Sequence, residues 1–118
     1  MCHYENKVFS LLALLWKLFF VTDVVMEVTD DKQLPKEERK RLQIEHAPHI
    51  SRRAKLVKLA DKLYNLRDLK QITPIGWSET RVQEYFEWAA MVVSGLRGTN
   101  KTMEDALDVI FAERGISK

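Results

Sequence analysis

The amino-acid sequence predicts an all-α protein of about five helices, and three observations support this. Apolar residues return at steps of three and four along several segments, which is the spacing of one helix face. Serine, threonine, proline and glycine stand near the borders of these segments, where helices begin and end. No stretch alternates apolar and polar residues as a half-buried strand would, and no internal repeat is present. We therefore expect helices packed on helices around one core.

The length and composition are those of an ordinary globular domain. The 118 residues suffice for one domain with a modest core, and 46% hydrophobic and 31% charged residues are usual for such a protein. A net charge of +2 is too small to require nucleic acid or an anionic membrane as a partner. The single cysteine, Cys2, has no intrachain partner for a disulfide, so we expect a reducing, cytoplasmic location.

Residues 1–25 form a divergent apolar segment that differs in character from residues 26–118. Val8–Val21 is almost wholly apolar and is interrupted by Ser10 and Lys17. It is shorter than the roughly 20 residues of a membrane span, and no small-residue cleavage site follows it, so we expect neither a span nor a signal peptide. A buried core helix is the leading interpretation. An interfacial or cryptic membrane segment and a stretch that does not fold properly are the alternatives.

Two prolines mark the borders of the next helix. Proline suits the first turn of a helix because its missing N–H costs nothing there, so we expect a charged, exposed helix from about Pro35 to His46. Pro48 should stop this helix. His46 and His49 are three residues apart, but Pro48 between them breaks the helical geometry that would align them. We therefore expect no metal site at these histidines.

The two longest helices follow. Ser51 is a suitable N-cap for a central helix that ends before the turn signature Thr73–Gly76. Ser78 is a suitable N-cap for a second helix through Leu96, and Gly98 is expected to stop it.

The last helix is expected to begin at Thr102 and to run to Gly115. Asp105 stands three residues after Thr102, which gives an approximate capping box. The apolar residues between these borders recur at helical steps, so this helix should also contribute one face to the core.

The central helix contains the chemically most informative residues. Within Lys55–Leu69 an apolar stripe recurs at helical steps, and Asp61 and Asn65 stand beside it, one turn apart on the same face. Asp61 is therefore expected at the edge of the core, where an unpaired carboxylate is costly. Its partner is either a metal ion or a neighbouring ammonium group, that of Lys58 or Lys62.

Aromatic and basic residues favour a ligand without requiring one. Trp77, Tyr85 and Trp88 suggest base stacking, although aromatic residues at helical spacing more often belong to a core. Basic residues outnumber acidic ones from Ser51 to Lys70, which favours a phosphate-bearing ligand, and a solvated helix face is the plain alternative. This basic helix also permits a small nucleic-acid binder, the least favoured hypothesis, and we expect no nucleic-acid partner.

Four stretches carry a family resemblance: VTDDKQLPKEERKRLQ, APH, AKLVKLADKLYNLRDL and GWSETRVQEYFEWA. They resemble the HD-type metal-dependent phosphohydrolases of the RelA/SpoT family, and in particular its small stand-alone animal branch, the metazoan SpoT homologues. The resemblance runs from about Val24 to about Ile116. It implies that residues 26–118 are a partial HD-type hydrolase domain, the C-terminal portion of an HD-domain-like helical bundle.

The resemblance also implies an activity and a set of site residues. The family removes the 3′-pyrophosphate of (p)ppGpp with manganese, and its animal members are also associated with dephosphorylation of NADPH. By the motif match, Asp61 is the late metal ligand and Asn65 contacts the sugar-phosphate part of the nucleotide. Trp77, Arg81 and Tyr85 lie in the segment that lines the substrate pocket.

The early ligands of that family are missing from the sequence. The family uses an early histidine, a His-Asp pair and a Glu-Asp pair, but no His-Asp dipeptide occurs here, and Glu104-Asp105 belongs to the last helix. We therefore expect a truncated isoform with impaired catalysis. The alternative is a catalytically silent interaction module that pairs with the full-length enzyme through an exposed apolar face, as a homo- or hetero-oligomer.

Overall fold

The computed structural model describes residues 22–117, and within this range it contains five α-helices, one 3₁₀ turn and no strand. The elements are α2 (Thr22–Val28), α3 (Lys36–His46), η1 (Ala47–His49), α4 (Arg52–Gln71), α5 (Glu79–Ser94) and α6 (Lys101–Glu113). The all-α prediction is thus confirmed. The apolar segment Val8–Val21 lies outside the described residues. Over residues 22–117, no helix combines the length and the apolar character that crossing a bilayer requires.

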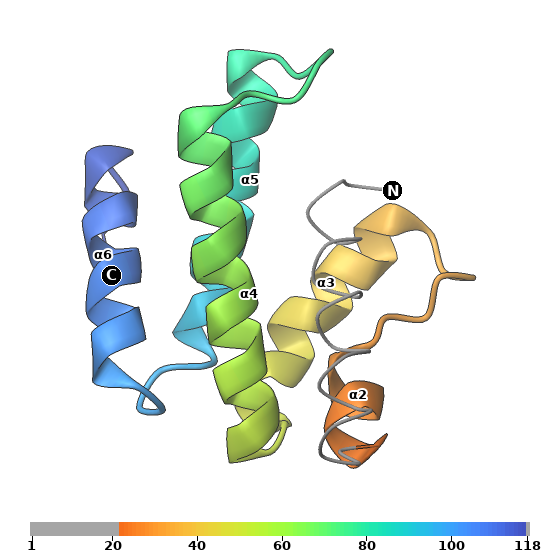
Figure 1. Cartoon of the computed structure of the whole chain (residues 1–118). Coiled ribbons are helices and arrows are strands. Elements are labelled where there is room, and N and C mark those ends of the chain that lie inside the picture. The colour runs from red at the N-terminus through yellow and green to blue at the C-terminus, as the bar shows by residue number, and fades with distance from the viewer. Residues whose placement is uncertain (1–21, 118) are drawn as a thin grey trace.

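The helices are arranged around α4. In Figure 1, α4 and α5 run side by side through the middle of the molecule, with α6 on one side and α2 and α3 on the other. Helix α4 contacts α2, α5 and α6, whereas α3 packs mainly on α5. The central position predicted for the Lys55–Leu69 stretch therefore holds in space.

The main core lies between α4, α5 and α6. Leu59 and Leu66 of α4, Phe86 of α5 and Leu107 of α6 are fully buried in it. A smaller cluster forms where α2 meets Ala54 at the start of α4. Helix α3 has no fully buried side chain, as its charged sequence predicts. Its position therefore depends on its partly buried side chains and its polar contacts.

Both long helices begin where the sequence predicts. The Ser51 hydroxyl accepts a hydrogen bond from the backbone N–H of Ala54 (3.2 Å), and the Ser78 hydroxyl accepts one from the N–H of Arg81 (3.1 Å). Each bond satisfies a backbone donor that the first turn of a helix leaves without a partner. These two N-caps are confirmed.

The predicted start of the last helix, a Thr102–Asp105 capping box, is wrong. Asn100 is the N-cap, and its side chain accepts a hydrogen bond of 2.9 Å from the N–H three residues on. The Glu104 carboxylate reaches back and accepts bonds from the N–H groups of Gly98 (3.0 Å), Thr99 (3.0 Å) and Asn100 (2.8 Å). Partial burial raises the pKa of Glu104, but these three bonds outweigh it and the pKa is lowered overall.

The junction between η1 and α5 is unusually close. Helix α5 ends at Ser94, earlier than predicted, because the chain leaves the helix at Gly95 and not at Gly98. A Cβ atom on Gly95 would lie 2.8 Å from Cβ of Ala47 and 2.8 Å from Cδ of Pro48. Helix α3 itself ends at His46 as predicted, and Pro48 lies within the 3₁₀ turn that follows it. Only glycine fits where these two backbones meet.

Candidate functional site

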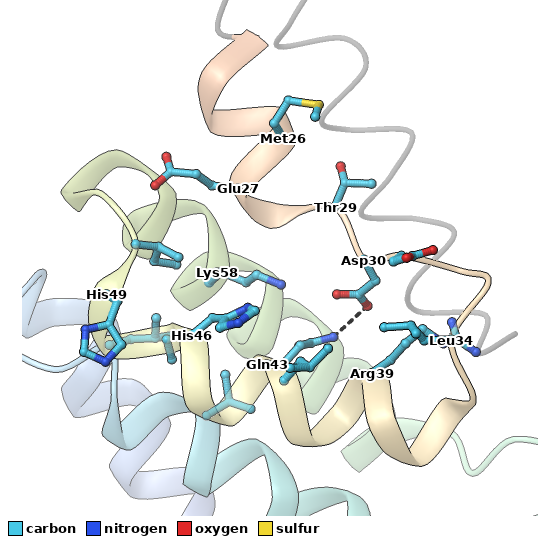
Figure 2. A pocket seen from close by; sticks show the side chains of 16 residues that line it. Met26, Glu27, Thr29, Asp30, Leu34, Arg39, Gln43, His46, His49 and Lys58 are labelled. Atoms are coloured by element: carbon cyan, nitrogen blue, oxygen red, sulfur yellow. Dashed lines mark hydrogen bonds between the residues drawn. The ribbon is translucent and has the colours of Figure 1, made fainter.

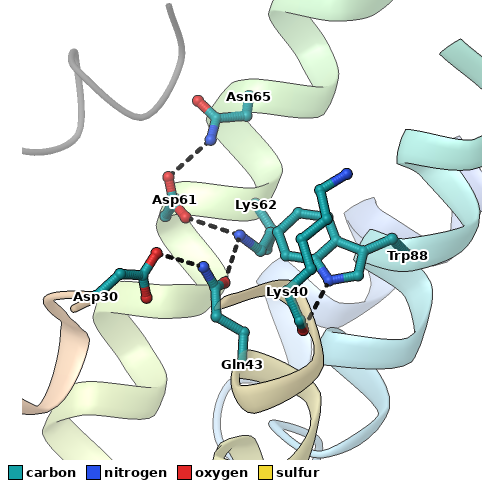
Figure 3. A network of polar contacts seen from close by, with 7 residues as sticks. All are labelled: Asp30, Lys40, Gln43, Asp61, Lys62, Asn65 and Trp88. Atoms are coloured by element: carbon teal, nitrogen blue, oxygen red, sulfur yellow. Dashed lines mark hydrogen bonds and ion pairs between the residues drawn. The ribbon is translucent and has the colours of Figure 1, made fainter. Parts of the chain in front are cut away.

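Asp61 and Asn65 lie one above the other on α4, as their spacing predicts. Asn65 Nδ2 donates a hydrogen bond of 2.8 Å to Asp61 Oδ1 (Figure 3). Asn65 is almost fully buried, and its Oδ1 atom has no hydrogen-bond partner. A buried acceptor without a donor is uncommon, so Asn65 is either slightly strained or prepared for a donor from a ligand.

Lys62 is the partner of Asp61. Its Nζ lies 3.1 Å from Asp61 Oδ2, and the two side chains are only 3% and 11% exposed. Lys62 Nζ also donates to Gln43 Oε1 (3.4 Å), and Gln43 Nε2 donates to Asp30 Oδ2 (2.8 Å). These five residues, Asp30, Gln43, Asp61, Lys62 and Asn65, form the Asp61 network. It connects the loop after α2 and helix α3 to α4 (Figure 3).

The described residues do not fit a manganese centre. Among residues 22–117, no group of three or more His, Cys, Asp and Glu side chains is placed to hold a metal ion. Both oxygens of Asp61 are engaged by Lys62 and Asn65. A single carboxylate with no co-ligand holds a divalent cation weakly, because manganese sites in proteins use several oxygen and imidazole ligands.

The other three predicted site residues lie together in a pocket. This hollow of 300 Å³ lies between α3 and the start of α5, and Trp77, Arg81 and Tyr85 all line it. Helix α3 adds two residues that the sequence did not indicate, Lys36 and Lys40. We call these five side chains the cationic–aromatic pocket. Asp61 and Asn65 do not line it, so the predicted site residues form two neighbouring groups.

Aromatic rings form one wall of this pocket. The ring centroids of Trp77 and Tyr85 are 5.8 Å apart, and the Arg81 guanidinium lies 4.2 Å from the Trp77 ring. Lys40 Nζ lies 5.8 Å from the Tyr85 centroid on the α3 side. Three cations against two acids on the rim, Glu37 and Glu84, give the hollow a positive balance. An anion that also carries a flat ring matches this combination of cations and aromatic faces.

Trp88 connects the pocket to the Asp61 network. Its ring lies 5.4 Å from that of Tyr85, and its indole N–H donates a 3.1 Å hydrogen bond to the backbone carbonyl of Lys40. The ammonium of Lys62 lies 4.4 Å from the centroid of the Trp88 ring (Figure 3). Trp88 therefore contacts the network through Lys62 and the pocket residues through Tyr85 and Lys40.

A larger cavity of 480 Å³ lies between the α2 loop, α3, η1 and α4 (Figure 2). His46 and His49 both line it, and among the described residues they have no third metal-ligating side chain to join them. It shares Asp30 and Gln43 with the Asp61 network, but none of the predicted site residues line it.

Three lysines of these two groups, Lys36, Lys40 and Lys62, were only weakly indicated by sequence patterns. The four-residue spacing of Lys36 and Lys40 places both on one face of α3. However, only the packing of α3 on α5 aligns that face with Arg81. Lys62 was one of two candidate partners for Asp61, and its contact with Trp88 joins residues 26 positions apart.

Close relatives are found for most of the chain. It is 70% identical over 97 residues to the Xenopus tropicalis protein named guanosine-3′,5′-bis(diphosphate) 3′-pyrophosphohydrolase MESH1, and 69% identical over 97 residues to that of Homo sapiens. It is 60% identical over 96 residues to that of Drosophila melanogaster. These matches take in 81–82% of this chain but only 54% of each relative, so the chain spans about half their length. No family model matches the chain.

One solved structure is also similar. It is described as a metazoan ortholog of SpoT that hydrolyzes ppGpp and plays a role in starvation responses. The TM-score is 0.79 at 51% sequence identity, and the match covers 98% of this chain and 61% of that one. Fold and sequence therefore point to the same relatives.

Proposed function

Because the matched part of this chain belongs to the family of metazoan SpoT homologues, we propose that it carries the nucleotide-recognition portion of a (p)ppGpp 3′-pyrophosphohydrolase. The observation that carries this proposal is the cationic–aromatic pocket, in which Lys36, Lys40 and Arg81 surround two aromatic rings. The named activity of the relatives, which act on a guanosine bis(diphosphate), supplies the class of ligand. NADPH, which has a phosphate on one ribose and flat rings, is the other candidate nucleotide.

We assign each side chain a role by its chemistry. Arg81 offers several N–H donors in a flat fork that matches phosphate, and Lys36 and Lys40 add positive charge from the opposite wall. Trp77 offers a ring face on which a nucleobase can stack. Asn65 does not line this pocket, but by the motif match it contacts the sugar-phosphate part of the nucleotide, and its buried Oδ1, which has no hydrogen-bond partner, can accept a bond from a hydroxyl group that reaches beyond the pocket.

Hydrolysis by these 118 residues is expected to be weak or absent. When bound, manganese would polarise a phosphoryl oxygen and lower the pKa of a bound water. Asp61 is the residue that would help to hold it, by the motif match. Asp61 has no co-ligand among residues 22–117 and the sequence contains no His-Asp pair, so turnover would need ligands from residues 1–21 or from another polypeptide. A cytoplasmic location stays a prediction based on the single cysteine.

The test is nucleotide binding measured by calorimetry with ppGpp and with NADPH. Arg81→Ala should weaken binding about tenfold or more, since a charge-assisted hydrogen bond contributes about 1.5–3 kcal/mol. Arg53→Ala removes the same charge from an exposed position that does not line the pocket, and it should leave the affinity unchanged. Equal losses of affinity in both variants would show that binding depends on net charge alone. This result would refute the pocket as the nucleotide-binding site.

A phosphate-release assay tests the catalytic part of the proposal. No release above background is expected across a manganese series from micromolar to millimolar. Manganese-dependent release that disappears in Asp61→Asn would show that this chain completes a metal site and would refute impaired catalysis.

A second candidate function is pairing with the full-length enzyme. The outward side of α4 carries exposed Ala60 and half-exposed Tyr64 at helical spacing, with Leu56 and Leu63 beside them only partly buried. Such a surface fits a further helix. Co-expression of this chain with a tagged full-length relative should recover both in one complex, and Tyr64→Glu should reduce the yield. A monomer with no association would exclude this function.

A further inference from the structure

We propose that Lys62 is the resident cation of Asp61, so that this carboxylate ties helices together here instead of holding a divalent ion. Asp61 Oδ2 contacts the Lys62 ammonium at 3.1 Å, while Oδ1 accepts from Asn65 at 2.8 Å. Neighbouring side chains on a helix diverge by about 100°, so this contact requires the long lysine chain to bend back. Both oxygens with which Asp61 could bind a metal ion are thus already engaged by Lys62 and Asn65.

The surroundings of Lys62 show why it stays there. Its side chain is 3% exposed, and a buried ammonium is tolerated only when its donors are satisfied. It has three neighbours from three helices: the carboxylate of Asp61 on α4, Gln43 Oε1 on α3, and the face of Trp88 on α5. A metal that displaced Lys62 from Asp61 would leave this ammonium buried without its counter-charge, which is strongly unfavourable.

The same arrangement gives Asp61 a structural role. Because Lys62 contacts side chains of α3 and α5, the Asp61–Lys62 pair helps to fix α3, which has no buried side chain of its own. Removing only the aspartate should therefore cost more than removing both partners. This inference does not rest on the cationic–aromatic pocket. Nucleotide binding measured on the same samples tests the proposed function independently of the stability of the Asp61–Lys62 pair.

A double-mutant cycle measured by thermal unfolding tests the pair. Asp61→Asn leaves the lysine unpaired and should lower Tm by roughly 10 °C or more. Lys62→Met keeps the length of the stem against Trp88 and should cost less, since the remaining carboxylate is more accessible and keeps its bond from Asn65. The double variant should be more stable than Asp61→Asn alone. If Asp61→Asn does not fold, the inference still requires the double variant to fold.

A matched exposed pair and a metal titration complete the experiment. Lys101 and Asp105 are 2.7 Å apart but 87% and 58% exposed, so the same cycle on them should show no coupling. Adding 1 mM MnCl₂ to the wild-type chain should shift its Tm by less than about 1 °C and leave the EPR signal of free Mn²⁺ unchanged. Additive losses in the Asp61–Lys62 cycle would overturn the inference. Stabilisation by manganese that Asp61→Asn abolishes would overturn it equally.

Discussion

The Asp61 network and the cationic–aromatic pocket both contact Trp88, yet they use charge in opposite ways. In the network, Asp61 and Lys62 are almost fully buried and neutralise each other within the chain. In the pocket, Lys36 and Arg81 are exposed and contribute to a positive balance around a hollow. The difference indicates that the polar groups satisfied by the fold maintain it, whereas the excess charge around the pocket is available to a ligand.

The largest expected difference in stability is between variants of Trp88 and Trp77, whose rings both pack against Tyr85. Trp88 is 7% exposed and joins both regions, so Trp88→Ala should lower the free energy of unfolding by about 3–5 kcal/mol in urea denaturation. Trp77 lies on the rim of the pocket and is only partly buried, so Trp77→Ala should cost about 1 kcal/mol while weakening nucleotide binding. Similar losses of stability in the two variants would remove the distinction between the regions.

Glu104 provides a second satisfied carboxylate and sharpens the comparison. Glu104→Gln should lower the free energy of unfolding by about 1 kcal/mol at pH 7, because the N-terminal turn of α6 loses charge-assisted bonds. The lowered pKa in the folded state means that this stabilisation is present above the ordinary pKa of 4.5 and is lost as the pH falls further below it. The difference between wild type and variant should therefore shrink in acid.

Urea denaturation of both proteins between pH 3 and pH 7 measures this effect. Glu87→Gln, an exposed substitution on α5, is the control and should show no pH-dependent difference. A constant difference between wild type and Glu104→Gln across the series would contradict the proposed role of the carboxylate.

Salt should affect the pocket and the network differently. Raising NaCl from about 50 to 500 mM should weaken nucleotide binding roughly fivefold or more, because charges exposed to solvent are screened. The stability cost of Asp61→Asn should change little, since a buried pair is screened much less. Calorimetry and thermal unfolding at the two salt concentrations measure both quantities, and equal salt sensitivity would contradict the contrast.

The smallest effect is expected at the exposed Lys101–Asp105 pair. The hydrogen bond from Lys101 to Asp105 raises the pKa of Lys101, but both side chains extend into solvent. Lys101→Ala should therefore leave Tm within experimental error, because mobile surface ion pairs contribute little. A clear loss of Tm would show that exposure is a poor guide to which charges maintain this fold.

The helices could be predicted because their signals are local. The caps at Ser51 and Ser78 and the stacking of Asp61 on Asn65 depend on neighbours within four residues, and all three are confirmed. The predicted start of α6 at Thr102 was wrong because a second capping residue stands nearby. Asn100, two residues earlier, competes for the role, and Glu104 stabilises that choice through backbone groups outside the helix.

The site could be predicted only in part because its assembly is not local. Trp77, Arg81 and Tyr85 come from one stretch and were found together. Lys36 and Lys40 come from a helix about forty residues earlier, whose own sequence indicates only a solvated face. No periodicity in the chain reveals that α3 lies along α5, so two of the three positive charges in the pocket could not be anticipated.

The close contact at Gly95 fixes the position of the C-terminal end of α3. At this end Ala47 and Pro48 lie against Gly95. From there α3 extends about 15 Å to Lys36, at 1.5 Å per residue. A methyl group at position 95 would push Ala47 and Pro48 away from α5. The tilt of α3 would then change, and with it the position of Lys36 and Lys40 opposite Arg81. We therefore expect the residue at position 95, at one end of α3, to affect the width of the cationic–aromatic pocket at the other end.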